Sequence, residues 1–136
     1  MESRHVSIEI DRPEAEVYAF AANPANLPLW AAGLTGSIER VDDEWVAESP
    51  LGPITVEFAA HNDFGILDHV VTTADGRRFH NPLRVIGFGS DGGGGRSELV
   101  FTVRRLEGMT DEQFEADVAA VAADLATLKR LLEAGS

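Results

Sequence analysis

The sequence predicts an α+β fold in which a long C-terminal helix covers an antiparallel sheet. Two patterns carry this prediction. Short segments in which apolar and polar residues alternate recur along much of the chain, as is typical of half-buried strands. In the last part of the chain, apolar residues instead recur at helical spacing. A sheet with one apolar face needs a cover, and the terminal helix is the only predicted element large enough to provide it.

The chain opens with a strand followed by two short helices. Residues 6–10 alternate between apolar and polar side chains, which predicts a strand with one buried face. Pro13 then stands at a favourable first position for a helix, where its missing N–H removes no hydrogen bond. Asn23-Pro24 ends this helix, and residues 25–30 predict a second short one.

Six further strands are expected to form a meander, because short polar turns separate them. They are predicted at residues 38–41, 45–48, 54–61, 66–74, 77–88 and 98–106. Asp75-Gly76 is a strong hairpin signal between two of these strands. A two-residue loop at this point would fix the register, placing Val70 opposite Asn81 and Asp68 opposite Leu83.

The last helix has the clearest signals. Thr110 with Gln113 three residues later forms a capping box at its start, and Gly135 closes it. Its apolar residues recur at spacings of four and three and therefore lie on one stripe. The stripe consists of Phe114, Val118, Val121, Leu125, Leu128 and Leu132. We therefore expect this helix to be a core element rather than a membrane-facing one.

Composition limits the classes of function. The 136 residues suffice for one domain over residues 1–136, and the absence of cysteine excludes disulfides and thiolate metal sites. The formal net charge of −12 argues against a nucleic-acid partner, which it would repel. The first residues lack the apolar run of a secretory signal, and no segment is apolar enough to span a membrane. We expect a cytoplasmic protein that does not insert into membranes.

The chain resembles the SRPBCC, or START-like, domains in two segments. These are the opening IEIDRPEAEVYAFAANPANLPLW and the closing FTVRRLEGMTDEQFEADVAAVAADLATLKRLLE. The family includes polyketide cyclases, START lipid carriers and plant pollen-allergen-like proteins. The resemblance implies a helix-grip fold, in which a seven-stranded antiparallel sheet wraps around the C-terminal helix and leaves a cavity between them. It implies no single function, because members bind lipids, hormones and polyketides and only some are enzymes.

The predicted hairpin register suggests which side chains enter this cavity. The face with Val70, Phe79 and Leu83 is the more apolar one and is expected to look inward. It also carries Asp68 and Asn81, which could orient a ligand or act as an acid/base pair. Alternatively, Asp68 is solvated near a strand end or bonds the backbone or Trp30. The residues predicted to contact a ligand are Trp30, Phe58, Asp68, Val70, Phe79, Asn81, Leu83, Phe101, Val118, Val121 and Leu125.

Other motifs give weaker signals. His61, His69 and His80 are expected on the outer face of the sheet, near Glu57, where no three ligands converge on one ion, so no metal site is predicted. This face could be solvated or form a homodimer. The glycines at residues 92–95 lack the sequence context of a phosphate-binding or dinucleotide-binding loop, so no cofactor is expected.

Three functions remain open at this point. The first is a carrier or sensor that binds a hydrophobic small molecule in the cavity. The second is an enzyme of the polyketide cyclase or dehydratase type that uses Asp68 with Asn81 or a histidine. The third is an interaction module whose cavity is filled by its own side chains. A void of a few hundred Å³ would separate the third from the other two.

Overall fold

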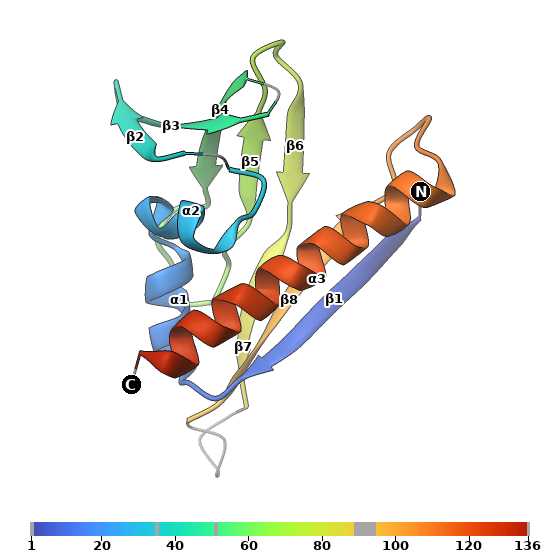
Figure 1. The fold of residues 1–136 in the computed structure, drawn as a ribbon. Helices are drawn as coiled ribbons and strands as arrows, with labels where there is room; N and C mark the ends of the chain where they lie inside the picture. The colour runs from blue at the N-terminus through green and yellow to red at the C-terminus, as the bar shows by residue number, and fades with distance from the viewer. Residues whose placement is uncertain (1, 35, 51, 89–94, 136) are drawn as a thin grey trace.

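The computed structural model describes residues 2–34, 36–50, 52–88 and 95–135. It confirms the predicted order of one strand, short helices, further strands and a long helix (Figure 1). The elements are β1 (Ser3–Ile10), α1 (Glu14–Ala21), the 3-10 helix η1 (Pro24–Asn26), α2 (Leu27–Trp30), β2 (Ile38–Val41), β3 (Glu44–Ser49), β4 (Gly52–Phe58), β5 (His69–Thr72), β6 (Arg78–Asn81), β7 (Leu83–Gly87), β8 (Ser97–Arg104) and α3 (Asp111–Ala134). Most of the glycine-rich segment lies outside the described residues.

The described strands form two antiparallel sheets, in the orders β1-β8-β7 and β2-β3-β4-β5-β6. The expectation of one seven-stranded sheet is therefore wrong. The strand predicted at residues 77–88 is divided by Pro82 into β6, which pairs with β5, and β7, which pairs with β8. Proline has no N–H to donate to a ladder, so the change of sheet at this residue has a direct physical cause.

The hairpin between β5 and β6 has a three-residue loop instead of the predicted two-residue loop. The Thr73 N–H donates to the Arg77 carbonyl at 2.9 Å, and the Gly76 N–H donates to the Thr73 carbonyl at 2.9 Å. Gly76 has a φ of 88°, a left-handed conformation that glycine adopts without strain and that this type of loop requires. His69 consequently pairs with Asn81, one residue away from the predicted register.

This one-residue shift corrects the predicted faces of β5. Side chains alternate along a strand, so a slip by one residue exchanges the two faces. Asp68 and Val70, which were expected inside, face outward. His69 and Val71, which were expected outside, face inward and line a cavity. On the partner strand, Phe79 and Asn81 are partly buried and alternate with the exposed Arg78 and His80, so their inward side agrees with the predicted one.

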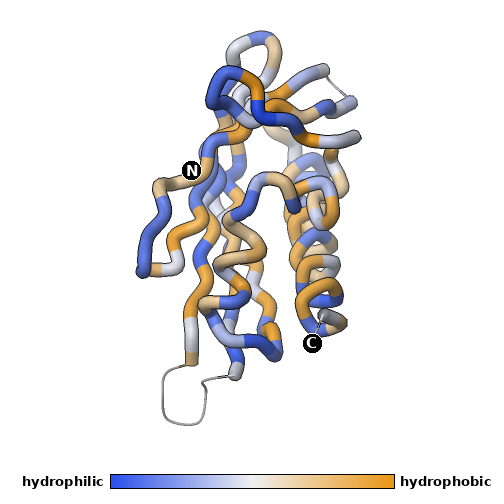
Figure 2. Tube along the Cα trace, turned by 90° about the vertical axis from the view of Figure 1, so that its left-hand side faces the viewer, coloured by the Kyte–Doolittle hydropathy of each residue, from blue (hydrophilic) through white to orange (hydrophobic). Residues whose placement is uncertain are grey.

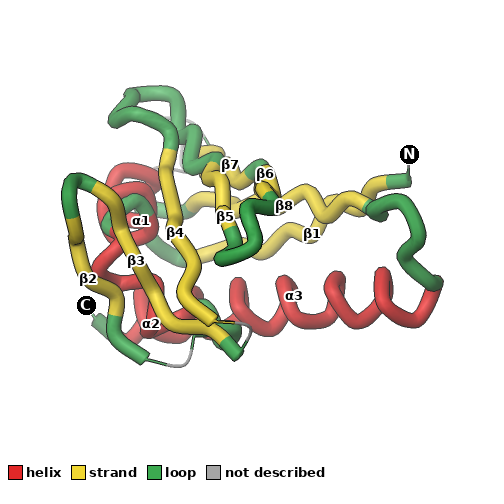
Figure 3. Tube along the Cα trace, turned by 90° about the horizontal axis from the view of Figure 1, so that it is seen from above, coloured by secondary structure: helices red, strands yellow, loops and turns green. Residues whose placement is uncertain are grey.

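The core lies between α3 and the three-stranded sheet. α3 packs against β1, β8 and α2 (Figures 1 and 3). Its predicted stripe faces this core, with Leu125, Leu128 and Leu132 buried among side chains of β1, β7 and β8. Apolar and polar residues alternate along the strands (Figure 2), as expected for a sheet with one buried face.

The start of α3 is fixed as the sequence predicts. The Gln113 N–H donates to Thr110 Oγ1 at 3.1 Å, and the Thr110 N–H donates to Gln113 Oε1 at 2.9 Å, which completes the capping box. In the ranges that the structure describes, none of the helices is both long and apolar enough to cross a membrane.

Candidate ligand-binding cavity

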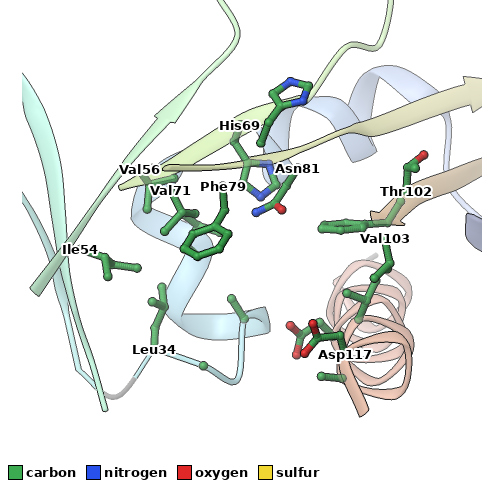
Figure 4. A pocket seen from close by; sticks show the side chains of 18 of the residues that line it. Leu34, Ile54, Val56, His69, Val71, Phe79, Asn81, Thr102, Val103 and Asp117 are labelled. Carbon is green, nitrogen blue, oxygen red and sulfur yellow. The ribbon is translucent and has the colours of Figure 1, made fainter. Parts of the chain in front are cut away.

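A cavity of about 560 Å³ lies between the five-stranded sheet, β8, α2 and α3. Most of its wall is apolar, and Figure 4 shows these side chains converging from several elements. Apolar residues in the wall include Leu34, Ile54, Val56, Val71, Phe79 and Phe101. Strand periodicity explains the arrangement, because alternate residues of β4 and β5 share the inner face and Val56 pairs directly with Val71.

The cavity wall contains six of the residues predicted to contact a ligand. They are Trp30, Phe79, Asn81, Phe101, Val121 and Leu125. The other five, Phe58, Asp68, Val70, Leu83 and Val118, do not line it. Leu83 is fully buried in the core, and Phe58 pairs directly with His69 and stacks its ring on the imidazole, with the centroids 4.9 Å apart. Contact of the six lining residues with a ligand stays a prediction.

Asp68 forms an ion pair on the outer face of the sheet. Its carboxylate accepts two hydrogen bonds from the Arg84 guanidinium and one from the Leu83 N–H, each at 2.9 Å. The Arg84 hydrogen bonds hold the pKa of Asp68 below its usual value, whereas the predicted inward position implied a raised pKa. Because Arg84 belongs to β7, this carboxylate joins the start of β5 to the other sheet. We assign it no ligand-orienting role.

His69 occupies the inward position that the sequence interpretation gave to Asp68. Only 7% of its surface is exposed, and its ring lies between the stacked Phe58 ring and the edge-on Phe101 ring. Its Nδ1 lies 3.1 Å from the Leu67 carbonyl oxygen. Burial lowers the pKa of His69, which favours the neutral imidazole. The signal for its position was the inward-facing Val71 two residues later, but the assumed two-residue loop obscured it.

Two more polar groups stand in the same wall. Asn81 lies directly opposite His69 in the ladder, and its side-chain amide makes no hydrogen bond to any described residue. Trp30 is 4% exposed, and its Nε1–H is buried without an acceptor among the described residues. Figure 4 shows His69 and Asn81 together on one side of the cavity, next to Phe79.

Charged side chains from both walls line the edge of the cavity. Asp117 and Asp124 come from α3, and Arg78 and Arg104 come from the facing strands. Asp124 is half-buried and accepts a hydrogen bond from the Ala32 N–H at 3.1 Å. Burial raises the pKa of this carboxyl group. The charged groups include both signs, so the edge selects neither anions nor cations by charge alone.

The predicted outer cluster of histidines does not form. His69 points inward, whereas His61 packs edge-on against Tyr18 with the ring centroids 5.4 Å apart. His80 is exposed and lies 4.0 Å from the Asp68 carboxylate. Within the described ranges, no three acidic or histidine side chains gather closely enough to hold a metal ion.

The short helices, the antiparallel strands and the long helix over a cavity define a START-like fold. No family profile matches the sequence, and no curated protein matches it either. Solved structures do match. A START superfamily protein from Mycobacterium smegmatis is 10% identical with a TM-score of 0.68, over 98% of this chain and 99% of that one.

Two other structures are similar over nearly the whole chain. An uncharacterised protein from Bacillus thuringiensis is 15% identical with a TM-score of 0.73, covering 96% of this chain and 98% of its own. The di-domain ARO/CYC protein BexL from the BE-7585A biosynthetic pathway is 17% identical with a TM-score of 0.70, covering 98% of this chain and 47% of its own. Likeness at these identities establishes the fold and not the activity.

Proposed function

We propose that the protein binds a hydrophobic small molecule in the cavity between the five-stranded sheet and α3, as a carrier or sensor. The cavity itself carries this proposal. Its volume of about 560 Å³ falls within the range of roughly 300–1,000 Å³ that small-molecule sites occupy. Its wall combines apolar side chains with a few polar groups, which is the composition expected of such sites. A void of this size gives no support to an interaction module with a filled cavity.

Neighbouring valines on β5 allow a matched test. Val71 lines the cavity, whereas Val70 faces outward. Val71→Phe should fill part of the void and greatly weaken binding of the fluorescent probe 1-anilinonaphthalene-8-sulfonate, measured by titration of its fluorescence. Val70→Phe adds the same group on the other face and should leave binding unchanged. Near-ultraviolet circular dichroism would verify that both variants are folded.

The same titration identifies a wrong proposal. If neither the wild-type protein nor the Val70→Phe variant binds the probe, the cavity is not a ligand site. If Val71→Phe binds the probe as tightly as the wild type, binding occurs elsewhere on the surface.

A dehydratase-type or cyclase-type enzyme is a second candidate, which the neutral His69 beside Asn81 favours. A neutral imidazole within reach of a bound molecule can accept a proton as a general base. For an aromatic β-hydroxy ketone, such a base would remove the proton next to the carbonyl, and the resulting imidazolium would deliver it to the departing hydroxyl, which leaves as water while the C=C bond forms. Mass spectrometry would detect the loss of water. A carrier would return the compound unchanged, whereas an enzyme would convert it and lose this activity in His69→Phe.

A further inference from the structure

We infer that the ligand of this cavity carries a neutral hydroxyl group that donates to Nε2 of His69 and accepts from the side-chain amide of Asn81. This inference rests on the proposed ligand-binding function and specifies the chemistry of the ligand. It would make His69 and Asn81 the residues that select among apolar molecules of similar shape.

The backbone fixes which nitrogen of His69 is free. A carbonyl oxygen can only accept, so the 3.1 Å contact with Leu67 requires the proton to be on Nδ1. In the neutral ring, Nε2 then has a lone pair and no proton. The rings of Phe58 and Phe101 hold the imidazole on one face and at the edge, so it cannot turn freely. The imidazole therefore presents a hydrogen-bond acceptor to the cavity in a fixed orientation.

Nε2 is also left available to a ligand. It makes no hydrogen bond to any described residue. Among the side-chain nitrogens and oxygens that the structure describes, only Trp30 Nε1 is both inaccessible to solvent and without a hydrogen-bond partner. Nε2 of His69 thus has no hydrogen-bond partner among the described residues but is still accessible, and His69 lines the cavity. An acceptor in a mostly apolar wall gains most from a ligand that donates to it.

Asn81 supplies the complementary half of the site. It pairs directly with His69 across the two strands, and side chains at such positions start about 5 Å apart on the same face. Its amide N–H groups can donate, whereas Nε2 can only accept. A hydroxyl group is the smallest group that does both at once, because its proton goes to Nε2 and its oxygen accepts from the amide. A ligand with only a carbonyl or ether oxygen would leave Nε2 facing another lone pair.

Two compounds of nearly equal shape test this inference. 2-Naphthol has the hydroxyl donor, and 2-fluoronaphthalene lacks it. For each protein we take the ratio of the dissociation constant of 2-fluoronaphthalene to that of 2-naphthol. We expect this ratio to be about 5-fold or more higher in the wild-type protein than in the His69→Phe variant, because an unpaired buried acceptor is costly. Comparing this ratio between the two proteins cancels the contribution of the different hydrophobicities of the two compounds. His61→Phe, at an exposed position outside this cavity, is the matched control and should keep the wild-type ratio.

Nitrogen-15 NMR of the wild-type protein gives a second readout that needs no variant. The unprotonated nitrogen of His69 should shift when 2-naphthol binds and stay nearly unchanged with 2-fluoronaphthalene. An equal ratio in the wild type and in His69→Phe, or equal shifts with both compounds, would overturn the inference while leaving the cavity as an apolar binding site. If neither compound binds, the proposed function fails together with it.

Discussion

The two sheets of this protein meet the long helix differently. β1 and β8 of the three-stranded sheet pack directly against α3, and around Ile10 and Leu99 their inward side chains form a closed core, whereas Phe101 and Val103 at the other end of β8 border the cavity. Strands β4, β5 and β6 of the other sheet stand opposite the same helix across the cavity. One apolar stripe on α3 therefore serves two purposes. Leu128 and Leu132 belong to the closed core, whereas Val121 and Leu125 also form part of the cavity wall.

The difference shows that an apolar pattern alone does not distinguish a core from a binding site. The stripe on α3 keeps the same helical spacing of large apolar residues along its whole length. At Pro82 the chain passes from one region to the other, since β6 lines the cavity and no residue of β7 does. We expect substitutions on the two sides of this division to affect stability and binding in different proportions.

The largest effect is expected at the closed end of α3. Leu128 is fully buried and does not line the cavity, so Leu128→Ala should lower the free energy of unfolding by about 2–5 kcal/mol. Leu125 is the matched control, because it is the same residue on the same stripe, 1% exposed, but borders the void. Leu125→Ala should cost less, since fewer packing contacts are lost. Urea unfolding measures both values, and equal losses would contradict the division.

A smaller effect is expected at the junction between the sheets. Asp68→Ala removes the bonds to Arg84 and to the Leu83 N–H and should lower the free energy of unfolding by about 1–2 kcal/mol at pH 7, since Arg84 is half-exposed. The pKa of Asp68 is lowered in the folded protein, so this contribution is full above about 3.8 and is lost as the pH falls through the folded value. Asp63→Ala, in an exposed loop, is the charge-matched control. A loss that stays constant from pH 7 to acid would refute the ion pair as its cause.

Much of the fold could be predicted because its signals are local. Strand alternation, the capping box at Thr110 and the stripe on α3 each depend on residues within a few positions of one another. The division into two sheets could not be predicted in the same way. Pro82 was visible in the sequence, but whether a proline ends a strand or transfers it to another sheet depends on which distant strand pairs beyond it.

The site was only partly predictable, because it depends on register. Trp30, Phe79 and Asn81 do line the cavity, and for Phe79 and Asn81 the face follows from the alternation along their own strand. Asp68 and His69 were exchanged, because Asp75-Gly76 fits both a two-residue loop and the last two positions of a three-residue loop. The extra loop residue moved every side chain of β5 to the other face. One loop residue thus decided whether the cavity holds a carboxylate or an imidazole.

The smallest effect concerns the imidazole itself. Burial lowers the pKa of His69 below the ordinary value of 6.5. Between 6.5 and the folded value, the unfolded chain binds more protons at this residue than the folded protein does, so stability falls as the pH falls through this window. Above 6.5 the residue contributes no pH dependence, and below the folded value its contribution levels off.

His69→Phe should therefore lose part of the wild-type decline in stability on acidification from pH 8 to about 5.5, measured by urea unfolding at each pH. His61→Phe removes an exposed histidine and should keep the decline. This window begins well above the one expected for Asp68, so the two residues can be separated by pH although they are neighbours in the chain. If His69→Phe and the wild type declined in parallel, His69 would be as accessible to protons in the folded protein as in the unfolded chain. The burial of His69 in the cavity wall would then be refuted.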